Sequence, residues 1–415
     1  MRGKAEQILP TGETVVRIDH GTVLVPNVIP GDIIDLELKE KRRGAARGEL
    51  VTVIEASASR VNPPCPAADR CGGCSLQFLA ADTHAALKSG WVYQAFRDCV
   101  DDTTDWIPAQ PSAGRRRRVR WSVGQDDDGT FLGFQERASH QPVRQTECMA
   151  VTDALLLLRR ELEHNTASMS GISSLQAIQL NDGIHVVLEG EPAAARAAEP
   201  RFDSVAGLPL QWWLRNGHGT RPLGRPVRQF HDRLPGVGKL PDIQVEIGPD
   251  DFIQAEETGN REMIRQLHAW AGEPRRAADL FAGVGNLSLS LAAAGIEVIG
   301  AEVNASSVLA ANRNAKRLGV PAKYIQADLF DRFDTAAFTG LDLIILDPPR
   351  KGARKVCEQV GRMLPRRIIM VSCDSAAGAR DGAILQRQGY RLRALRALDL
   401  FPYAGHVEAI SLWSQ

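Results

Sequence analysis

The chain from about residue 8 to residue 55 alternates hydrophobic and polar positions in short runs. These runs are "ETVVRIDHG", "GTVLVPNVIPGDIIDLELKEK" and "RGELVTVIEAS", and Gly, Pro and Asp separate them. A period of two in β-branched residues predicts strands with one buried face, joined by tight turns. We therefore expect residues 1–57 to form a small β-barrel or curled sheet.

The pattern of residues 58–250 is mixed. It contains a helical stretch, "LAADTHAALKSGWVYQAFRDCV", then a hairpin pattern with its turn at "DDDGT", and later strands such as "AIQLNDGIHVVLEG". A helix and several hairpins in one stretch predict a central α+β region.

Residues 251–415 show a third pattern, in which wholly apolar runs alternate with helical ones. The runs "EVIGAEVN", "LDLIILDPPR" and "RRIIMVSCD" have no polar face until they end. Strands that are buried on both faces are typical of an open, mostly parallel sheet covered by helices. The predicted fold class is therefore α/β for the last part of the chain.

Composition adds little until charge is located along the chain. The 415 residues carry 50 Lys and Arg against 50 Asp and Glu, so a basic footprint for nucleic acid would have to be local. Charge runs are usually solvated faces, but clustering in a neutral protein favours a surface that follows phosphates. Two clusters stand out: Arg115 to Arg118 with Arg120 and Trp121, and Arg215, Arg221, Arg225, Arg228 and Arg233.

The seven cysteines depend on the compartment for their interpretation. The N-terminus has no apolar signal core, and no apolar run is long enough to span a membrane, so we expect a cytoplasmic protein with reduced thiols. Three of the thiols lie in "CPAADRCGGC", residues 65–74. Clustered thiols in a reducing compartment indicate metal binding or catalysis rather than disulfides.

Carboxylates follow successive strands of the predicted parallel sheet. Asp279, Glu302, Asp328 and Asp347 each stand at or near a strand end. Open α/β sheets bind ligands at this edge, and an acidic side chain there can accept hydrogen bonds from ribose hydroxyls. One such carboxylate would be ordinary solvation, but the ordered set resembles the S-adenosylmethionine site of the class I methyltransferases.

The turn after the first of these strands, "DLFAGVGN", contains Gly283 and Gly285. Glycines there let a ligand approach the backbone, although a lone G-x-G also occurs in ordinary strand-to-helix turns. Ser288 stands where a dinucleotide fingerprint would have a third glycine, which disfavours a nicotinamide cofactor.

Two further residues are candidates for chemistry at the same edge. Cys373, in "MVSCDS", ends an apolar strand just before an expected helix start, which would stabilise a thiolate. Taken alone, such a cysteine is more often part of a core. Glu408 is flanked by Val407, Ala409 and Ile410, so its carboxyl group should be partly buried, with a raised pKa suited to a general base.

Four motifs, "DLFAGVGN", "LDPPRKGA", "SCDSAAGARD" and "FPYAGHVE", together resemble the RNA uridine-C5 methyltransferase family. The resemblance is to its iron–sulfur branch that acts on 23S rRNA and has an N-terminal TRAM domain. It implies a TRAM-like barrel at 1–57, an iron–sulfur loop and central RNA-facing domain at 58–250, and a class I, Rossmann-like methyltransferase domain at 251–415.

The resemblance also implies roles for single residues. Cys373 would attack C6 of a flipped uridine, and Glu408 would remove the C5 proton after methyl transfer. Two local departures are Ala255 to Glu257, where the family has an asparagine soon after a glutamine, and "YAGHVE", which lacks a threonine before its histidine. The implied contacts to S-adenosylmethionine are Gln254, Phe281, Gly283, Gly285, Asn286, Glu302, Asp328 and Asp347.

The resemblance completes the cysteine motif with a distant fourth thiol. Cys65, Cys71 and Cys74 give C-x5-C-x2-C, and Cys148 stands where the family has the last ligand of a [4Fe–4S] cluster. Tetrahedral zinc and three plain core cysteines are the alternatives. We expect the cluster to be structural, because methyl transfer from a sulfonium needs no electrons. Cys99 and Cys357 lie in helical patterns and are expected to be packed and inert.

The expected partner is RNA. The protein is expected to be a monomer and not to associate with a membrane. One alternative is an RNA cytosine-C5 methyltransferase, which typically has a cysteine after its Asp-Pro-Pro motif, where this chain has Arg350. Others are a tRNA uridine-C5 methyltransferase and a non-catalytic iron–sulfur RNA-binding protein; the pairing of Cys373 with Glu408 disfavours the last.

Overall fold

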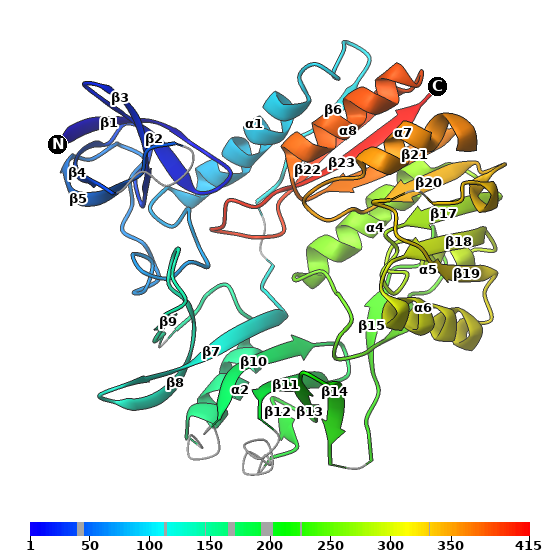
Figure 1. Ribbon diagram of the computed structural model, residues 1–415, viewed down its shortest axis with the longest axis horizontal. Coiled ribbons are helices and arrows are strands. Elements are labelled where there is room, and N and C mark those ends of the chain that lie inside the picture. The colour runs from blue at the N-terminus through cyan, green and yellow to red at the C-terminus, as the bar shows by residue number, and fades with distance from the viewer. Residues whose placement is uncertain are drawn as a thin grey trace.

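In the described residues, three large β-sheets and one two-stranded ribbon follow one another along the chain, and helices cover mainly the last sheet (Figure 1). No helix among the described residues is long and apolar enough to cross a membrane.

Arg225 of the second arginine cluster lies outside the residues that the structure describes. The computed structural model describes residues 1–39, 45–111, 114–145, 147–164, 171–191, 202–224, 226–331 and 333–415.

The first sheet is antiparallel and curled. Its strands, in the order β3-β2-β1-β4-β5, bury alternate side chains such as Val16, Val23 and Ile34. Leu24 N donates to Ala46 O at 2.9 Å, which draws β3 toward the start of β5. The predicted small barrel is therefore confirmed as a half-closed one. The strands are β1 (Arg2–Ile8), β2 (Glu13–Ile18), β3 (Gly21–Pro26), β4 (Ile33–Leu38) and β5 (Gly48–Glu55).

Among the described residues the central sheet has eight strands, and helix α2 (Asp153–His164) covers it. Trp121, Leu155 and Leu175 are fully buried between the sheet and α2. A separate two-stranded ribbon, β15 (Phe230–Leu234) with β16 (Ile243–Ile247), leads to the last sheet. The central strands are β7 (Arg118–Asp126), β8 (Gly129–Gln135), β9 (Pro142–Val143), β10 (Ile172–Gln179), β11 (Ile184–Gly190), β12 (Ser204–Val205), β13 (Leu208–Asn216) and β14 (Gly219–Leu223).

The third sheet has the order β19-β18-β17-β20-β21-β23-β22-β6. Its first five strands are parallel, and β23 is antiparallel to its neighbours. The inner strands β17, β20 and β21 are almost wholly buried, as the apolar runs predicted, whereas β19 at the edge buries only Tyr324. The strands are β17 (Arg276–Leu280), β18 (Glu297–Glu302), β19 (Ala322–Gln326), β20 (Leu343–Leu346), β21 (Arg367–Ser372), β22 (Arg391–Leu398) and β23 (Glu408–Ser414). The helices are α4 (Glu257–Ala271), α5 (Leu289–Ala293), α6 (Ala305–Leu318), α7 (Arg354–Met363) and α8 (Ser375–Arg387), with 3-10 turns at Ala81–Thr83 and Ala336–Phe338.

An early segment of the chain completes this late sheet. β6 (Asp105–Ile107) pairs in parallel with β22, and α1 (His84–Phe96) packs beside α8 (Figure 1). Val92 and Phe96 of α1 are fully buried in the same core as Trp413. The division of the chain at residues 57 and 250 stays a prediction, but residues 251–415 do not form the third sheet alone.

Candidate active site

The carboxyl ends of four parallel strands meet at one edge of the third sheet. Phe281 follows β17, Glu302 ends β18, Asp328 comes two residues after β19, and Asp347 follows β20. The register pairs Leu280 with Ala301 and with Leu346, so these ends are level with one another. The structure thus brings together the side chains that the sequence placed at separate strand ends.

The turn after β17 lets a ligand reach the backbone. Phe281 has a φ of 69° and Gly283 a φ of 53°, both in the left-handed region. A Cβ built on Gly283 would have no described atom within 4 Å, whereas one on Gly285 would lie 2.7 Å from the Tyr324 hydroxyl. The open space over Gly283 adjoins Glu302, whose Oε2 accepts from Gly283 N at 3.1 Å.

Gln254 and Asn286 are fixed by neighbours from other elements. Asn286 and Asn260 exchange side-chain hydrogen bonds of 3.0 and 2.9 Å. Gln254 is buried, and its carbonyl accepts from Arg117 Nε at 3.2 Å. Glu256, in the stretch that departs from the family pattern, caps α4 by accepting from Thr258 N and Gly259 N at 2.6 and 2.5 Å.

Asp279 has a buried carboxyl group beneath this turn. The sequence placed it at a strand end but did not predict it as a cofactor contact. Its Oδ2 accepts from the Ser288 hydroxyl at 2.5 Å, and that hydroxyl also contacts the Tyr324 hydroxyl at 2.9 Å. Burial, with a smaller contribution from Glu302, raises the pKa of Asp279 to about 7. Its Oδ1 has no hydrogen-bond partner within the described part of the chain. The hydroxyl at position 288 thus has a structural use that a third glycine could not supply.

Cys373 and Glu408 face each other across two antiparallel strands. β21 and β23 pair Ser372 with Ala409, and the next step of this register sets Cys373 opposite Glu408. Side chains directly opposite in an antiparallel pair lie on the same face. Two residues 35 positions apart in sequence (408 − 373) are therefore neighbours at the ligand-binding edge.

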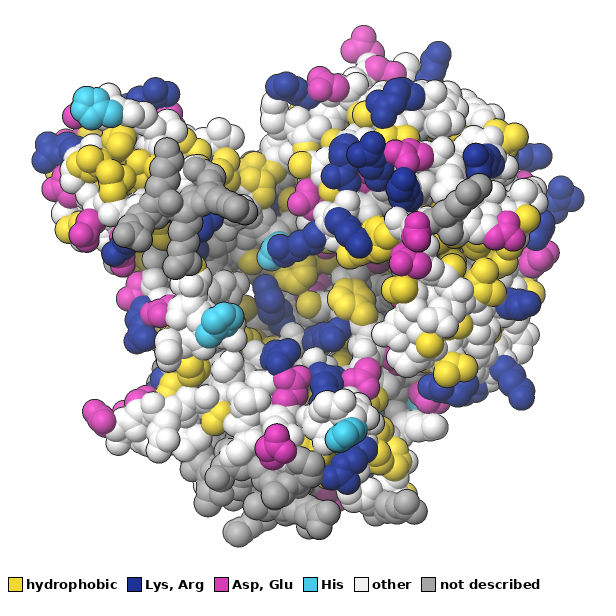
Figure 2. All heavy atoms as spheres, in the orientation of Figure 1, with side chains coloured by type: hydrophobic (Ala, Val, Ile, Leu, Met, Phe, Trp, Pro, Cys, Tyr) yellow, Lys and Arg dark blue, Asp and Glu magenta, His cyan; other side chains and the backbone are white. Residues whose placement is uncertain are grey.

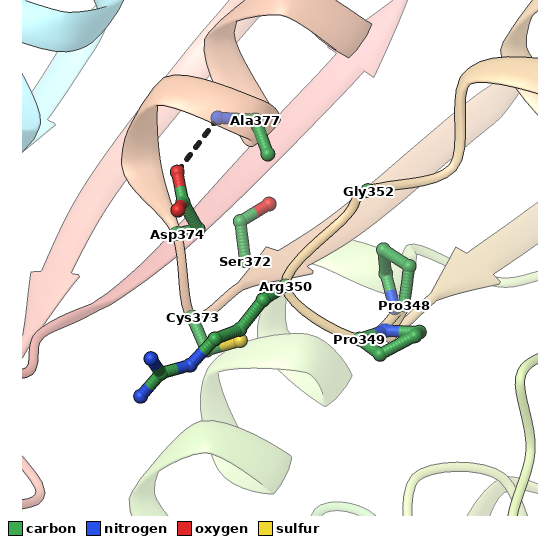
Figure 3. Close-up of a pocket in the computed structure, with 9 residues that line it drawn as sticks. Pro348, Pro349, Arg350, Gly352, Ser372, Cys373, Asp374 and Ala377 are labelled. Atoms are coloured by element: carbon green, nitrogen blue, oxygen red, sulfur yellow. Dashed lines mark hydrogen bonds between the residues drawn. The ribbon is translucent and has the colours of Figure 1, made fainter. Parts of the chain in front are cut away.

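The environment of Cys373 favours a neutral thiol. Burial, together with the charges of Glu408 and Asp347, raises the pKa of Cys373 to about 12, and Arg350 opposes this. Asp374 caps α8 by accepting from Ala377 N at 2.9 Å, so the helix start already holds a carboxylate (Figure 3). The expectation that the helix start would hold Cys373 as a thiolate therefore does not agree with the structure.

A small pocket lies beside Cys373. This shallow space of about 140 Å³, which includes its open mouth, lies between the Asp-Pro-Pro-Arg turn and the start of α8, and Arg350 runs alongside Cys373 (Figure 3). Glu408 is only 6% exposed, and burial, with a contribution from Asp347, raises its pKa to about 8, while Arg350 lowers it. This agrees with the partly buried carboxyl group that its apolar neighbours predicted.

The four cysteines of the predicted cluster line a second pocket. Cys65, Cys71, Cys74 and Cys148 surround a space of about 500 Å³ that includes its open mouth. Gln145 Nε2 donates to Cys71 Sγ at 2.8 Å, and burial raises the pKa values of Cys71, Cys74 and Cys148. In the described ranges, no three Cys, His, Asp or Glu side chains are grouped closely enough to hold one ion.

Cys99 and Cys357 lie elsewhere, as predicted. Both are buried in the hydrophobic core around α1, α7 and α8. Burial raises the pKa of each thiol, to about 11 for Cys99, so neither is a reactive thiolate.

The first arginine cluster does not form one phosphate-tracking face. Arg117 is buried and makes bonds of 2.6 and 2.8 Å to Asp232, while Arg115 pairs with Asp153. Arg116 lies over the Phe401 ring, at 5.0 Å from its centroid. These three arginines lie in the bridged segment that leads into β7, where neighbouring side chains of an extended backbone point to opposite faces.

The second cluster is also largely paired. Arg215 bonds Glu189 and Asp250, and Arg228 pairs with Asp203, which leaves Arg221 and Arg233 as exposed members among the described residues. Lys and Arg side chains nevertheless gather around the hollow between the three sheets (Figure 2). A basic surface therefore exists on this face of the molecule, although several arginines of the two clusters are occupied by ion pairs.

Comparison with known proteins agrees with this geometry. A family model described as Methyltransferase small domain matches residues 256–367. A 23S rRNA (uracil(1939)-C(5))-methyltransferase RlmD from Aeromonas hydrophila is 31% identical over 409 residues, which cover 95% of this chain and 91% of the relative. A protein of the same name from Pseudomonas putida is also 31% identical and covers 98% and 92%.

A solved structure shows the same fold over the whole chain. It is the tRNA (uracil-54, C5)-methyltransferase of Pyrococcus abyssi in complex with S-adenosyl-L-homocysteine. The TM-score is 0.75 at 23% identity, and the match covers 100% of this chain and 99% of that one. The predicted class I methyltransferase architecture is confirmed, and the chain belongs to the RNA uracil-C5-methyltransferase family.

Proposed function

We propose that this protein transfers a methyl group from S-adenosylmethionine to C5 of a uridine in RNA, and that the RNA is 23S ribosomal RNA. The observation that carries the proposal is the placement of Cys373 opposite Glu408 at the edge where the parallel strands end. The names of the relatives support the choice of RNA and base.

The residues at this edge fit S-adenosylmethionine, which when bound supplies the electrophilic methyl group. Asp279 Oδ1 is buried and has no partner among the described residues, which costs free energy. It is suited to accept a hydrogen bond from the ammonium group of the cofactor. Glu302 uses one backbone bond per oxygen and keeps lone pairs for the two ribose hydroxyls. Gln254, Phe281, Asn286, Asp328 and Asp347 complete the proposed cofactor site, with Gly283 and Gly285 in the turn.

The proposed reaction uses Cys373 and Glu408 in sequence. The Cys373 thiol loses its proton to solvent and bonds to C6 of the uracil, and the resulting enolate takes the methyl group at C5, which leaves S-adenosylhomocysteine. Glu408 then removes the C5 proton, and the bond between Cys373 and C6 breaks to restore the aromatic ring. Asp347 and Glu408 both interact electrostatically with the thiol, so two carboxyl groups are placed to influence its ionisation.

The test of this proposal separates the two roles. Cys373→Ala should abolish methylation while S-adenosylhomocysteine binding, measured by calorimetry, stays within about twofold, because the thiol acts on the base. Glu408→Gln should form the RNA adduct but release it slowly, so that a denaturant-stable protein–RNA band accumulates. Normal methylation by the cysteine variant would refute the nucleophile assignment.

The identity of the RNA needs a cellular experiment. Cells that lack the protein should lose 5-methyluridine at one or more 23S rRNA positions, and nucleotide-resolution mapping would locate them. Loss of 5-methylcytidine instead would show a cytosine enzyme, and a loss confined to transfer RNA would show the tRNA alternative.

We propose further that the cysteine pocket holds a [4Fe–4S] cluster. Zinc with bonds of about 2.3 Å would bring four sulfurs to within about 4 Å of each other, and no such group exists among the described residues. Four thiols around a larger space suit a cluster whose own iron and sulfide atoms lie between the ligands. The Gln145 bond to Cys71 is of the kind that tunes cluster sulfurs.

Anaerobically purified protein should be brown, with about four irons per chain by the stoichiometry of this cluster. Cys148→Ala should lose iron as fully as Cys71→Ala, whereas Cys99→Ala, a buried cysteine outside the pocket, should keep it. Zinc, or no metal, in protein prepared without oxygen would refute the cluster.

The remaining parts of the proposal concern organisation. The half-closed first sheet at residues 1–57 supports a TRAM-like domain that presents RNA, residues 58–250 would carry the cluster and the RNA-facing sheet, and residues 251–415 would bind the cofactor. The enzyme would act as a monomer in the cytoplasm.

A further inference from the structure

The loop at residues 399–407, which leads into Glu408, adopts a conformation that needs support. Tyr403 has a φ of 64°, in the left-handed region that an aromatic residue rarely adopts and that costs about 1–2 kcal/mol. Inside the loop, Phe401 N donates to Asp399 Oδ1 at 2.9 Å and Ala404 N donates to Phe401 O at 3.1 Å. These two bonds stop short of Glu408, so other parts of the chain must fix the end of the loop.

The segment directly after the cysteine motif supplies one group of contacts. Ser75 N and Leu76 N both donate to Tyr403 O at 2.8 Å. Gly405 N in turn donates to Ser75 Oγ at 3.0 Å. Three hydrogen bonds therefore hold the carbonyl of the strained residue, and the backbone just after it, to a segment more than 300 positions earlier in the chain.

Helix α1 supplies a second group of contacts. Lys88 Nζ donates to Asp399 Oδ1 and to Phe401 O, each at 2.7 Å. The side chains of Lys88 and Asp399 are 0% and 3% exposed, so water cannot replace these bonds. The His84 ring also packs edge-on against the Tyr403 ring, with centroids 5.6 Å apart.

We propose that residues 75–88 position the catalytic base, by holding the loop at 399–407 in the conformation that presents Glu408 to the site. Ser75 and Lys88 are the positioning residues of this contact. The inference rests on the proposed role of Glu408 as the base, and it adds a task to a part of the chain otherwise assigned to the cysteine pocket. Because Ser75 directly follows Cys74, one peptide bond separates a cysteine of the pocket from a residue that hydrogen-bonds to the loop at 399–407.

The contact should affect one step of the reaction more than the other. Cys373 directly follows β21, in the middle of the sheet, and neither Ser75 nor Lys88 bonds to it. Attack on C6 therefore depends little on the loop. Removal of the C5 proton depends on where Glu408 lies, and a displacement of about 1 Å can cost about 100-fold in rate.

The experiment compares Ser75→Ala and Lys88→Met with the unmodified enzyme in two assays. The first is the rate of adduct formation on 5-fluorouridine RNA, which has no C5 proton and so does not need the base. The second is the decay of the methylated adduct on ordinary uridine RNA in a single turnover. We expect adduct formation within about threefold of normal and decay slowed by about 10-fold to 100-fold, with KM for RNA unchanged.

Arg261→Met is the control, because Arg261 makes a partly buried ion pair with Asp242 at 2.8 Å and, among the described residues, bonds neither to residues 75–88 nor to the loop at 399–407. It should lower thermal stability without slowing decay. Ser75→Ala removes one oxygen atom, so it keeps the test available if Lys88→Met does not fold. Ser75→Thr, which retains the hydroxyl acceptor, should keep more of the decay rate than Ser75→Ala.

Equal losses in both assays, or decay at the normal rate in both variants, would overturn the inference. The proposed function has separate controls. If the unmodified enzyme forms no 5-fluorouridine adduct, or if Glu408→Gln releases its adduct normally, then the function itself fails. If those controls behave as expected and only the positioning variants do not, the function stands and the inference falls.

Discussion

Glu408 is a carboxyl group whose surroundings set the pH at which it can act. A general base must be ionised, and burial has raised the pKa of Glu408 to about 8. The decay of the methylated adduct should therefore speed up with pH, about tenfold per unit below pH 8 and little above it. Single-turnover decay measured from pH 6 to 9.5 tests this, and a flat profile would contradict it.

Arg350 gives this pH profile a second test. Its charge lowers the pKa of Glu408, so Arg350→Gln should move the profile to higher pH. Arg362→Gln, which removes an arginine from the end of α7 with no part in this interaction, should leave the profile in place. A shift to lower pH in Arg350→Gln would show that the electrostatic account is wrong.

A substitution at Gly283 can separate the effect of backbone strain on stability from the effect of a filled binding site on cofactor affinity. Gly283 and Gly295 both have positive φ angles, 53° and 89°, and a Cβ on either would have no described atom within 4 Å. Alanine at each position should therefore cost a similar free energy of unfolding, about 1 kcal/mol. Only Gly283→Ala fills space beside Glu302, so it alone should weaken S-adenosylhomocysteine binding, by about tenfold or more, which is about 1.4 kcal/mol.

Isothermal titration calorimetry and urea unfolding on the two variants separate these effects. Equal losses of affinity in Gly283→Ala and Gly295→Ala would mean that strain in the domain, and not the ligand space, determines binding.

At the scale of elements, the ion pair between Arg117 and Asp232 joins the central sheet to the cofactor segment. Both side chains are at most 4% exposed, and Arg117 also bonds the carbonyl of Gln254. Arg117→Met would leave a buried carboxylate without its partner and should cost about 3–5 kcal/mol in the free energy of unfolding. The double variant Arg117→Met/Asp232→Leu should recover most of that loss.

Chemical unfolding of the variants measures how much this ion pair contributes to the free energy of unfolding, and Arg354→Ala is the control. Arg354 pairs with Glu358 on an exposed helix face, where removal should cost about 0.5 kcal/mol or less. A single variant at position 117 that is no less stable than this control would show that the buried pair does not anchor the segment.

The elements that could be read from the sequence are those whose surroundings are uniform. β20 is buried on both faces, so "LIIL" needs no knowledge of its neighbours to be recognised as a strand. The carboxylates after such strands could be placed because parallel strands share one carboxyl edge. In the same way, the pairing register of β21 and β23 places Cys373 beside Glu408 once the two strands are known.

The features that the sequence did not predict depend on residues far away in the chain. Arg117 looks like its neighbours in a basic run, but Asp232, 115 positions away, makes it structural. The raised pKa of Cys373 follows from burial that the assembled sheet creates and from the charges of Glu408 and Asp347. The sequence of α1 predicted a helix correctly, but nothing in it indicated that the helix packs on α8.

At the scale of the whole molecule, the first 110 residues fall into two parts with different consequences for stability. Removal of residues 1–57 takes away the first sheet only, and the remaining protein should still unfold cooperatively and bind S-adenosylhomocysteine. Removal of residues 1–110 also takes away α1 and β6. Val92 and Phe96 alone bury side chains worth about 1.5–3 kcal/mol each, so this fragment should be insoluble or lack a cooperative transition.

Solubility, thermal unfolding and cofactor titration of the two truncations test this. A longer truncation that is as stable as the shorter one would show that the third sheet does not need its early strand.

The pairing of β6 with β22 has a consequence for how the protein is made. Asp105 leaves the ribosome long before its partner Ala394 exists, and β23, which inserts between β21 and β22, is the last strand to be synthesised. During most of translation the apolar side of α1 therefore has nothing to cover it, and contacts this distant in sequence form slowly. A nascent chain would depend on chaperones over this interval. It would also remain inactive until Glu408 has been synthesised, because Glu408 is the proposed base and begins β23.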